Sequence, residues 1–181
     1  MNRKLGIIWI TRTSIFIALL IVLQAATAPL GNIVITGSIV NLLLVVSVMT
    51  CGPASGLTVA VVSPIMAKFL GIGPLWSLIP FIALGNVVLV LAWHLIGNRN
   101  MGRKHVAYFI ASVFAALAKF LVLYIGIVQI AVPLFLGLPE KQAAVISNMF
   151  SIPQLITALV GGVMATALFP RLRKAFGQER E

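Results

Sequence analysis

The chain has 181 residues, of which 61% are hydrophobic and only 9% are charged, with a net charge of +10. A soluble domain carries about a quarter charged residues and could not hide this much apolar surface, so the composition excludes a water-soluble protein. The positive charge does not indicate nucleic-acid binding, because the basic residues lie at the ends of apolar runs and no basic and aromatic platform accompanies them.

The apolar runs predict an all-α integral membrane protein that forms one transmembrane domain over residues 1–181. Runs of roughly 20 apolar residues match the ~30 Å hydrocarbon layer of a bilayer. The first three spans are expected at Thr13–Ala28, Ile33–Cys51 and Ala54–Leu70. Gly and Pro occur at nearly every boundary between them, as turns require.

The second half of the chain predicts three further spans. The fourth is expected at Leu75–Ile96, and a basic loop follows it. The fifth begins near Val106, but Val106–Leu138 is apolar for 33 residues, which is longer than one span needs. We therefore expect a span to about Gly126 and then a partly buried or re-entrant segment; a seventh span is the alternative. The last span is expected at Ala143–Phe169.

Lysine and arginine distribution predicts that both termini are cytoplasmic. Cytoplasmic loops carry an excess of Lys and Arg. One side of the six-span arrangement carries ten such residues, and the other side's loops carry only Lys141. The ten are Arg3, Lys4, Arg12, Arg99, Arg103, Lys104, Arg171, Arg173, Lys174 and Arg180. This asymmetry also supports an even number of spans.

Acidic residues are nearly absent, which bears on the kind of function. The three acids, Glu140, Glu179 and Glu181, all lie outside the expected spans. Ion-coupled carriers and membrane enzymes that hold a metal usually need a carboxylate at membrane depth. We therefore expect a binding protein that is not an enzyme, has no metal site and no covalently bound cofactor, and takes any energy from a partner.

Polar residues inside the spans gather in the outer half of the membrane, where they predict a pocket open to the outside. The candidate substrate-binding residues are Thr36, Asn41, Lys68, Trp76, Asn86, Lys119, Asn148 and Gln154. Several have a structural alternative. Asn41 and Asn86 could be interhelical hydrogen-bonding residues, Lys68 could extend to the outer headgroups, and Trp76 could be an interface anchor.

Small residues spaced four apart let helices approach closely. Ser14 and Ala18 form such a pair on the first span and are the candidates for binding an external partner. A stripe of small and polar residues on the last span, from Ser147 to Ala165, favours packing within the monomer.

Taken together, the sequence resembles the substrate-binding S components of energy-coupling factor (ECF) vitamin transporters. The resemblance covers nearly the whole chain and depends on its size, its six spans, the Ser14/Ala18 pair and the stretches 35–41, 63–71 and 79–86. The family prefers alanine at both positions of the pair, so Ser14 is a mild departure.

The resemblance implies a multi-pass protein of a prokaryotic cell membrane that binds a vitamin from outside. It implies docking on a membrane scaffold (T) subunit through the first three spans, with two cytoplasmic ATPases using ATP to power the complex. It also implies that the subunit topples in the membrane to release its ligand inside.

The stretch from Thr36 to Asn86 looks most like members assigned to cobalamin. Pantothenate, hydroxymethylpyrimidine and a queuosine precursor are the alternatives, and Lys68 or Lys119 would suit an anionic ligand such as pantothenate. A membrane enzyme and a channel or interaction-only subunit are the alternatives of another class.

Overall fold

The computed structural model describes residues 3–98 and 104–175. These residues form helices and connecting loops, with no strand among them. The helices are α1 (Arg3–Thr27), α2 (Ile33–Cys51), α3 (Pro53–Phe69), α4 (Ile79–Gly97), α5 (Lys104–Leu123), α6 (Glu140–Met149) and α7 (Ile152–Ala175). Three further helical segments are η1 (Ala28–Leu30), η2 (Trp76–Leu78) and the π-helical η3 (Tyr124–Phe135), which continues α5.

Five helical segments of the described chain are long and apolar enough to cross a membrane. They are Gly6–Leu30, Ile33–Cys51, Trp76–Gly97, Val106–Phe135 and Glu140–Leu172. The sixth predicted span corresponds to α3, which is apolar but has only 17 residues. The fold is therefore an all-helical bundle with five to six membrane-capable helices.

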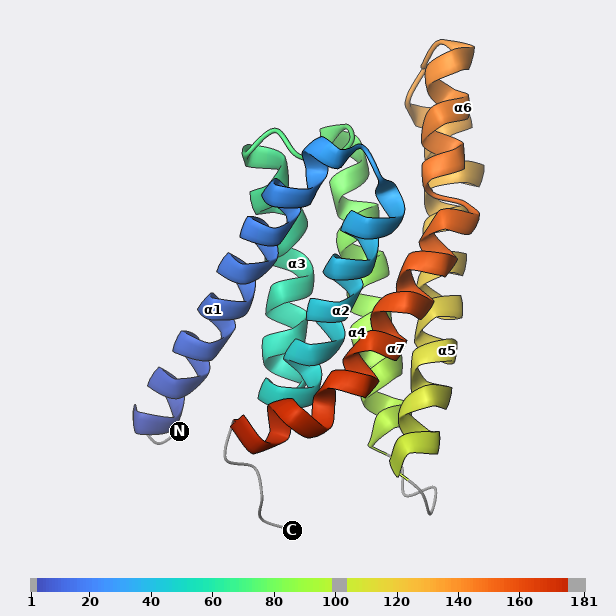
Figure 1. Cartoon of the computed structure of the whole chain (residues 1–181). Coiled ribbons are helices and arrows are strands. Elements are labelled where there is room, and N and C mark those ends of the chain that lie inside the picture. Colours follow the sequence, from blue (N-terminus) through green and yellow to red (C-terminus); the bar gives the residue numbers. More distant parts are fainter. Residues whose placement is uncertain (1–2, 99–103, 176–181) are drawn as a thin grey trace.

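The start of α1 and the end of α7 lie at one end of the bundle, which we call the terminal end (Figure 1). The connection between α1 and α2, the loop over residues 70–75 and α6 lie at the opposite end, which we call the loop end (Figure 1). This arrangement is the one expected of an even number of crossings. Three of the ten residues on the predicted basic side, Arg99, Arg103 and Arg180, lie outside the described residues.

The first helix begins ten residues earlier than the predicted span, because charged residues do not end a helix. Lys and Arg are good helix formers, and their long side chains can extend from an apolar surface to water. The predicted second span coincides with α2 and the third differs from α3 by one residue at each end. Between them, Gly52 has φ of +85°, and Pro53 starts α3.

The predicted re-entrant segment after Gly126 is wrong, since the helix continues to Phe135. Pro133 removes one N–H but does not end the helix, as membrane helices tolerate proline. The helix stops before Gly137, whose φ is +52°, and Pro139. The resulting hairpin of η3 and α6 rises above the other loops (Figure 1).

The predicted last span is also interrupted, because α6 ends at Met149 and α7 begins at Ile152. Pro153 explains the break. In a continuous helix its ring would clash with the carbonyl of Met149, four residues earlier, and it has no N–H to donate.

Helix α2 is central, with contacts to α1, α3, α4 and α7. Its contact with α7 is especially close. A Cβ atom added at Gly161 would lie 2.7 Å from Leu42 N and from Ser38 O, and one at Gly37 would lie 2.8 Å from Thr157 Cγ2. Ala158 and Ala165 are buried on the same helix. The small-residue stripe of the last span therefore serves packing within the monomer, as predicted.

Candidate functional site

A cavity of about 280 Å³ lies at the loop end of the bundle. Its upper wall comes from η1, from Ile72, Gly73 and Pro74 of the loop over residues 70–75, and from the break between α6 and α7. Its deepest side chains come from α2, α4 and α5. Asn41 lies nine residues beyond Asn32, the N-cap of α2, or about 13 Å at 1.5 Å per residue. The cavity thus reaches well into the bundle.

Lys119 of α5 is held at this depth by two asparagines. Its Nζ donates to Asn41 Oδ1 and to Asn86 Oδ1, each at 2.7 Å. All three side chains are at most 3% exposed. A charged lysine has three N–H donors, so two amide acceptors leave one donor for a further acceptor. Among the described residues, no carboxylate lines the cavity.

Each asparagine is fixed in turn by a neighbouring helix. Asn41 Nδ2 donates to Thr157 Oγ1 of α7 at 3.3 Å, and Asn86 Nδ2 donates to the carbonyl oxygen of Ala60 of α3 at 3.4 Å. The network therefore joins α2, α3, α4, α5 and α7. Asn41 and Asn86 both connect helices and line the cavity, so the two interpretations weighed from the sequence are compatible.

Two prolines each leave a backbone carbonyl, four residues earlier, without its usual helical N–H donor, and these two carbonyls orient two amide side chains of the cavity. Pro64, inside α3, has no N–H to donate to Ala60, four residues earlier, and that carbonyl accepts from Asn86 instead. In the same way, the carbonyl of Met149, four residues before Pro153, accepts from Gln154 Nε2 at 3.3 Å. Both amides also line the cavity.

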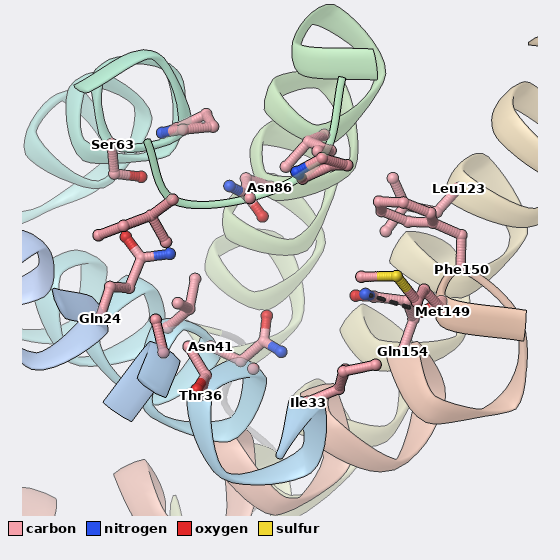
Figure 2. Close-up of a pocket in the computed structure, with 18 of the residues that line it drawn as sticks. Gln24, Ile33, Thr36, Asn41, Ser63, Asn86, Leu123, Met149, Phe150 and Gln154 are labelled. Carbon is pink, nitrogen blue, oxygen red and sulfur yellow. Dashed lines mark hydrogen bonds between the residues drawn. The ribbon is translucent and has the colours of Figure 1, made fainter. Parts of the chain in front are cut away.

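Two cavity side chains have polar atoms that are buried and without a hydrogen-bond partner among the described residues. These atoms are Gln24 Oε1 and Ser63 Oγ. Figure 2 shows Gln24 and Ser63 on one side of the opening and Met149, Phe150 and Gln154 on the other. An unsatisfied buried polar atom costs about 1–3 kcal/mol. A ligand that hydrogen-bonds to these atoms would recover this cost.

The remaining lining is largely apolar, including Val40, Ile82, Leu123 and Phe150. The cavity therefore offers one cation, several hydrogen-bonding groups and an apolar wall. Small-molecule sites have this composition, with a few polar groups that orient a ligand against a mainly apolar surface.

Five of the eight predicted substrate-binding residues line this cavity, namely Thr36, Asn41, Asn86, Lys119 and Gln154. The structure does not bring the other three to it. Lys68 lines a separate open groove, and Asn148 is exposed on α6. Trp76 is 52% exposed and packs edge-on against Phe69, with ring centroids 5.0 Å apart, as suits an interface anchor.

Several lining residues were not among the predicted ones. Gln24 and Ser63 are polar residues at membrane depth, so the rule that selected Asn41 could have selected them. The same rule could have selected Thr157, which accepts a hydrogen bond from Asn41. Pro64, Met149 and Phe150 carry no such signal, because their contribution depends on a free carbonyl or on a break between helices.

The predicted partner-binding residues, Ser14 and Ala18, are exposed on α1. They lie on an outward face together with Ile15 and Leu19, which are 58% and 41% exposed. Ile15 and Leu19 also line a mainly apolar cavity of about 250 Å³ between α1, α2 and α7. This face lies near the middle of α1, and none of its four residues lines the polar cavity.

A family model for the substrate-specific component of ECF transporters matches residues 9–173 of the chain. The match spans all the helices that line the cavity. Comparison with curated proteins found no match, and comparison with solved structures found none either.

Proposed function

Because the chain belongs to the family of ECF transporter substrate-specific components, we propose that the cavity at the loop end is its substrate site. In this proposal the protein captures a vitamin or related small solute from outside. It delivers the solute inward together with a scaffold subunit and two cytoplasmic ATPases. Substrate-binding subunits of this kind are not enzymes, and ATP is used by the partners.

The observation that carries the proposal is the network around Lys119 inside a cavity. Five helices contribute to it, and its three central side chains are almost fully buried. Burying a cation and two amides is costly unless their hydrogen bonds are satisfied. Their gathering beside an apolar wall at one end of the bundle supports a binding role over a purely structural one.

The size of the cavity bears on the choice of solute. Small-molecule sites typically have volumes of roughly 300–1,000 Å³, and this cavity has about 280 Å³. Cobalamin, the solute favoured by resemblance, is a macrocycle far larger than most small ligands. The volume supports a smaller solute, such as pantothenate, hydroxymethylpyrimidine or a queuosine precursor.

The proposed orientation places the terminal end, with both chain termini, in the cytoplasm and the cavity toward the outside. The lysine and arginine distribution supports this orientation. In this orientation the exposed Ser14/Ala18 face of α1 lies on the cytoplasmic side of the cavity residue Gln24. A scaffold subunit reached by the cytoplasmic ATPases could contact it there.

Native mass spectrometry of the protein purified from cells grown in rich medium tests the proposal. The expected result is one small solute bound per chain, with uptake of that solute in cells only when the scaffold and ATPases are co-expressed. Robust uptake by the chain alone would contradict the proposal. So would the absence of any bound solute together with failure to bind a panel of vitamins.

A further inference from the structure

A second hollow, an open groove of about 660 Å³, adjoins the cavity at the loop end. It lies between the loop over residues 70–75 and α6, with Leu75, Val145 and Ile146 among its lining residues. Three residues, Gly73, Pro74 and Met149, line both the groove and the cavity. The groove and the cavity are therefore direct neighbours along these three residues.

Two lysines from distant parts of the chain line this groove. Lys68 is half-buried in the last turn of α3, and Lys141 is exposed in the first turn of α6. Among the described residues, no acid lines the groove. The neighbouring Glu140 is exposed and is not part of the lining.

Helix stability explains the position of only one of these two lysines. A cation near a helix C-terminus, as with Lys68, interacts favourably with the helix dipole, whereas a cation in the first turn, as with Lys141, does not. Glu140 is the residue that suits the start of α6. Lys141 therefore has a position that its own helix does not favour, directly beside the groove.

We infer that the groove is the route by which the solute reaches the cavity, and that the solute is a small organic anion, a carboxylate or a phosphate ester. This inference depends on the proposed function. Lys68 and Lys141 attract the anion to the groove, and Lys119 then binds its charged group with the donor that the two asparagines leave free. Gln24 and Ser63, which also line the cavity, bind an uncharged polar group of the same molecule.

Charges along a route raise the association rate of an oppositely charged ligand by about 10- to 1,000-fold, and salt weakens the effect. Charges at the bound position act mainly on the dissociation rate. Kinetic measurements therefore separate Lys68 and Lys141, which should affect the association rate, from Lys119, which should affect the dissociation rate.

The test compares paired probes that differ in one charged group, such as pantothenate with its neutral alcohol pantothenol and pyridoxine phosphate with pyridoxine. Binding is measured with protein in a neutral detergent, so that no anionic lipid competes. The charged member of at least one pair is expected to bind at least 100-fold more tightly. Equal or tighter binding of the neutral members would overturn the inference while leaving the proposed function intact. Failure of all probes, with a different solute found by native mass spectrometry and shown to be uncharged, would overturn it as well.

Stopped-flow kinetics with the bound anion then tests the route. The double variant Lys68→Gln/Lys141→Gln is expected to lower the association rate about tenfold, to flatten its dependence on salt and to leave the dissociation rate unchanged. Arg171→Gln, which removes one exposed charge at the terminal end, is the matched control and leaves both rates unchanged. Lys119→Gln, whose amide can still donate to one asparagine, is expected to raise the dissociation rate about 100-fold.

An association rate that the double variant does not change would overturn the route. Adding vesicles of anionic phospholipid tests whether Lys68 and Lys141 bind lipid headgroups instead of attracting the solute. If the lysines serve lipid headgroups instead, the double variant will lose lipid binding but keep its association rate for the probe.

Discussion

Pro64 illustrates how a residue without a polar side chain can shape a polar site. Its missing N–H leaves the carbonyl of Ala60 to accept from Asn86, whose other end accepts from Lys119. The position of Lys119 thus depends on a backbone group two contacts away. A reading of the sequence that considers only polar side chains does not find this dependence.

Replacing Pro64 with alanine is expected to weaken solute binding about fivefold without lowering the thermal stability. The new N–H competes with Asn86 for the Ala60 carbonyl, and losing one hydrogen bond costs about 1 kcal/mol. Isothermal titration and thermal unfolding in detergent measure the two effects. Pro170→Ala, at a helical proline of α7 outside the cavity, is the control and leaves the affinity unchanged. Unchanged binding by Pro64→Ala would show that Asn86 does not depend on Ala60.

Ser63→Ala is expected to weaken binding by a few-fold while the melting temperature stays constant or rises. Ser63 Oγ has no partner among the described residues, so its removal takes nothing from the folded protein and relieves a cost of desolvation. Ser47→Ala is the matched control, because Ser47 is buried and bonded to Leu44 away from the cavity. A loss of stability with intact affinity would assign Ser63 to the fold instead of the site.

At the scale of elements, the hydrophobic pattern predicted α2, α3 and α4 closely but failed at both ends of α6. Apolar run length cannot distinguish a re-entrant segment from a long helix, and η3 is apolar throughout. The break at Phe150 and Ser151 depends on Pro153, but the hydrophobic pattern predicted one continuous span across this proline. This missed break is also why Met149 and Phe150 were not predicted to line a site.

The contact between α2 and α7 predicts that Gly161→Ala is destabilising by about 1–3 kcal/mol, as overpacking usually is. The added methyl group meets backbone atoms of Ser38 and Leu42, which cannot move aside as a flexible side chain would. It also meets Asn41 Cβ at 2.7 Å, so affinity should fall together with stability. Met164→Ala, on an exposed face of the same helix, is the control, measured by thermal unfolding. A stable Gly161→Ala variant would show that the two helices can separate at no cost.

The exposed face of α1 predicts that Ala18→Leu prevents transport but not binding. A larger side chain at this position blocks close approach by another helix and touches nothing in the cavity. Uptake by cells expressing the whole complex should be lost, whereas solute binding by the purified variant should be unchanged. Normal uptake by Ala18→Leu would exclude this face as the contact with the scaffold.

At the scale of the whole molecule, the sequence predicted the class of protein and the end at which polar groups gather, because polar residues inside lipid are costly and usually face a cavity or another helix. It could not predict which polar residues meet. Asn148 and Gln154 lie on different helices, and only Gln154 lines the cavity. Lys68 lies near the same end of the bundle as the cavity but faces a different hollow.

Cysteine labelling tests the proposed orientation of the bundle. In a Cys51→Ser background, Glu140→Cys at the loop end should react with a membrane-impermeant maleimide added to intact cells. Arg171→Cys at the terminal end should react only after the membrane is permeabilised. Both positions are exposed in the structure. The reverse pattern would place the cavity on the cytoplasmic side and contradict capture from outside.

The tight glycine contacts between α2 and α7 have a practical consequence for selectivity. Helices that already touch at Gly37 and Gly161 cannot move closer, and Gly37, which lines the cavity, leaves no room for a larger side chain. The upper wall is different, because Ile72, Gly73 and Pro74 belong to the loop over residues 70–75 and not to a helix. Engineering the protein to accept a bulkier molecule should therefore begin with this loop, where the chain can be lengthened without disturbing the bundle.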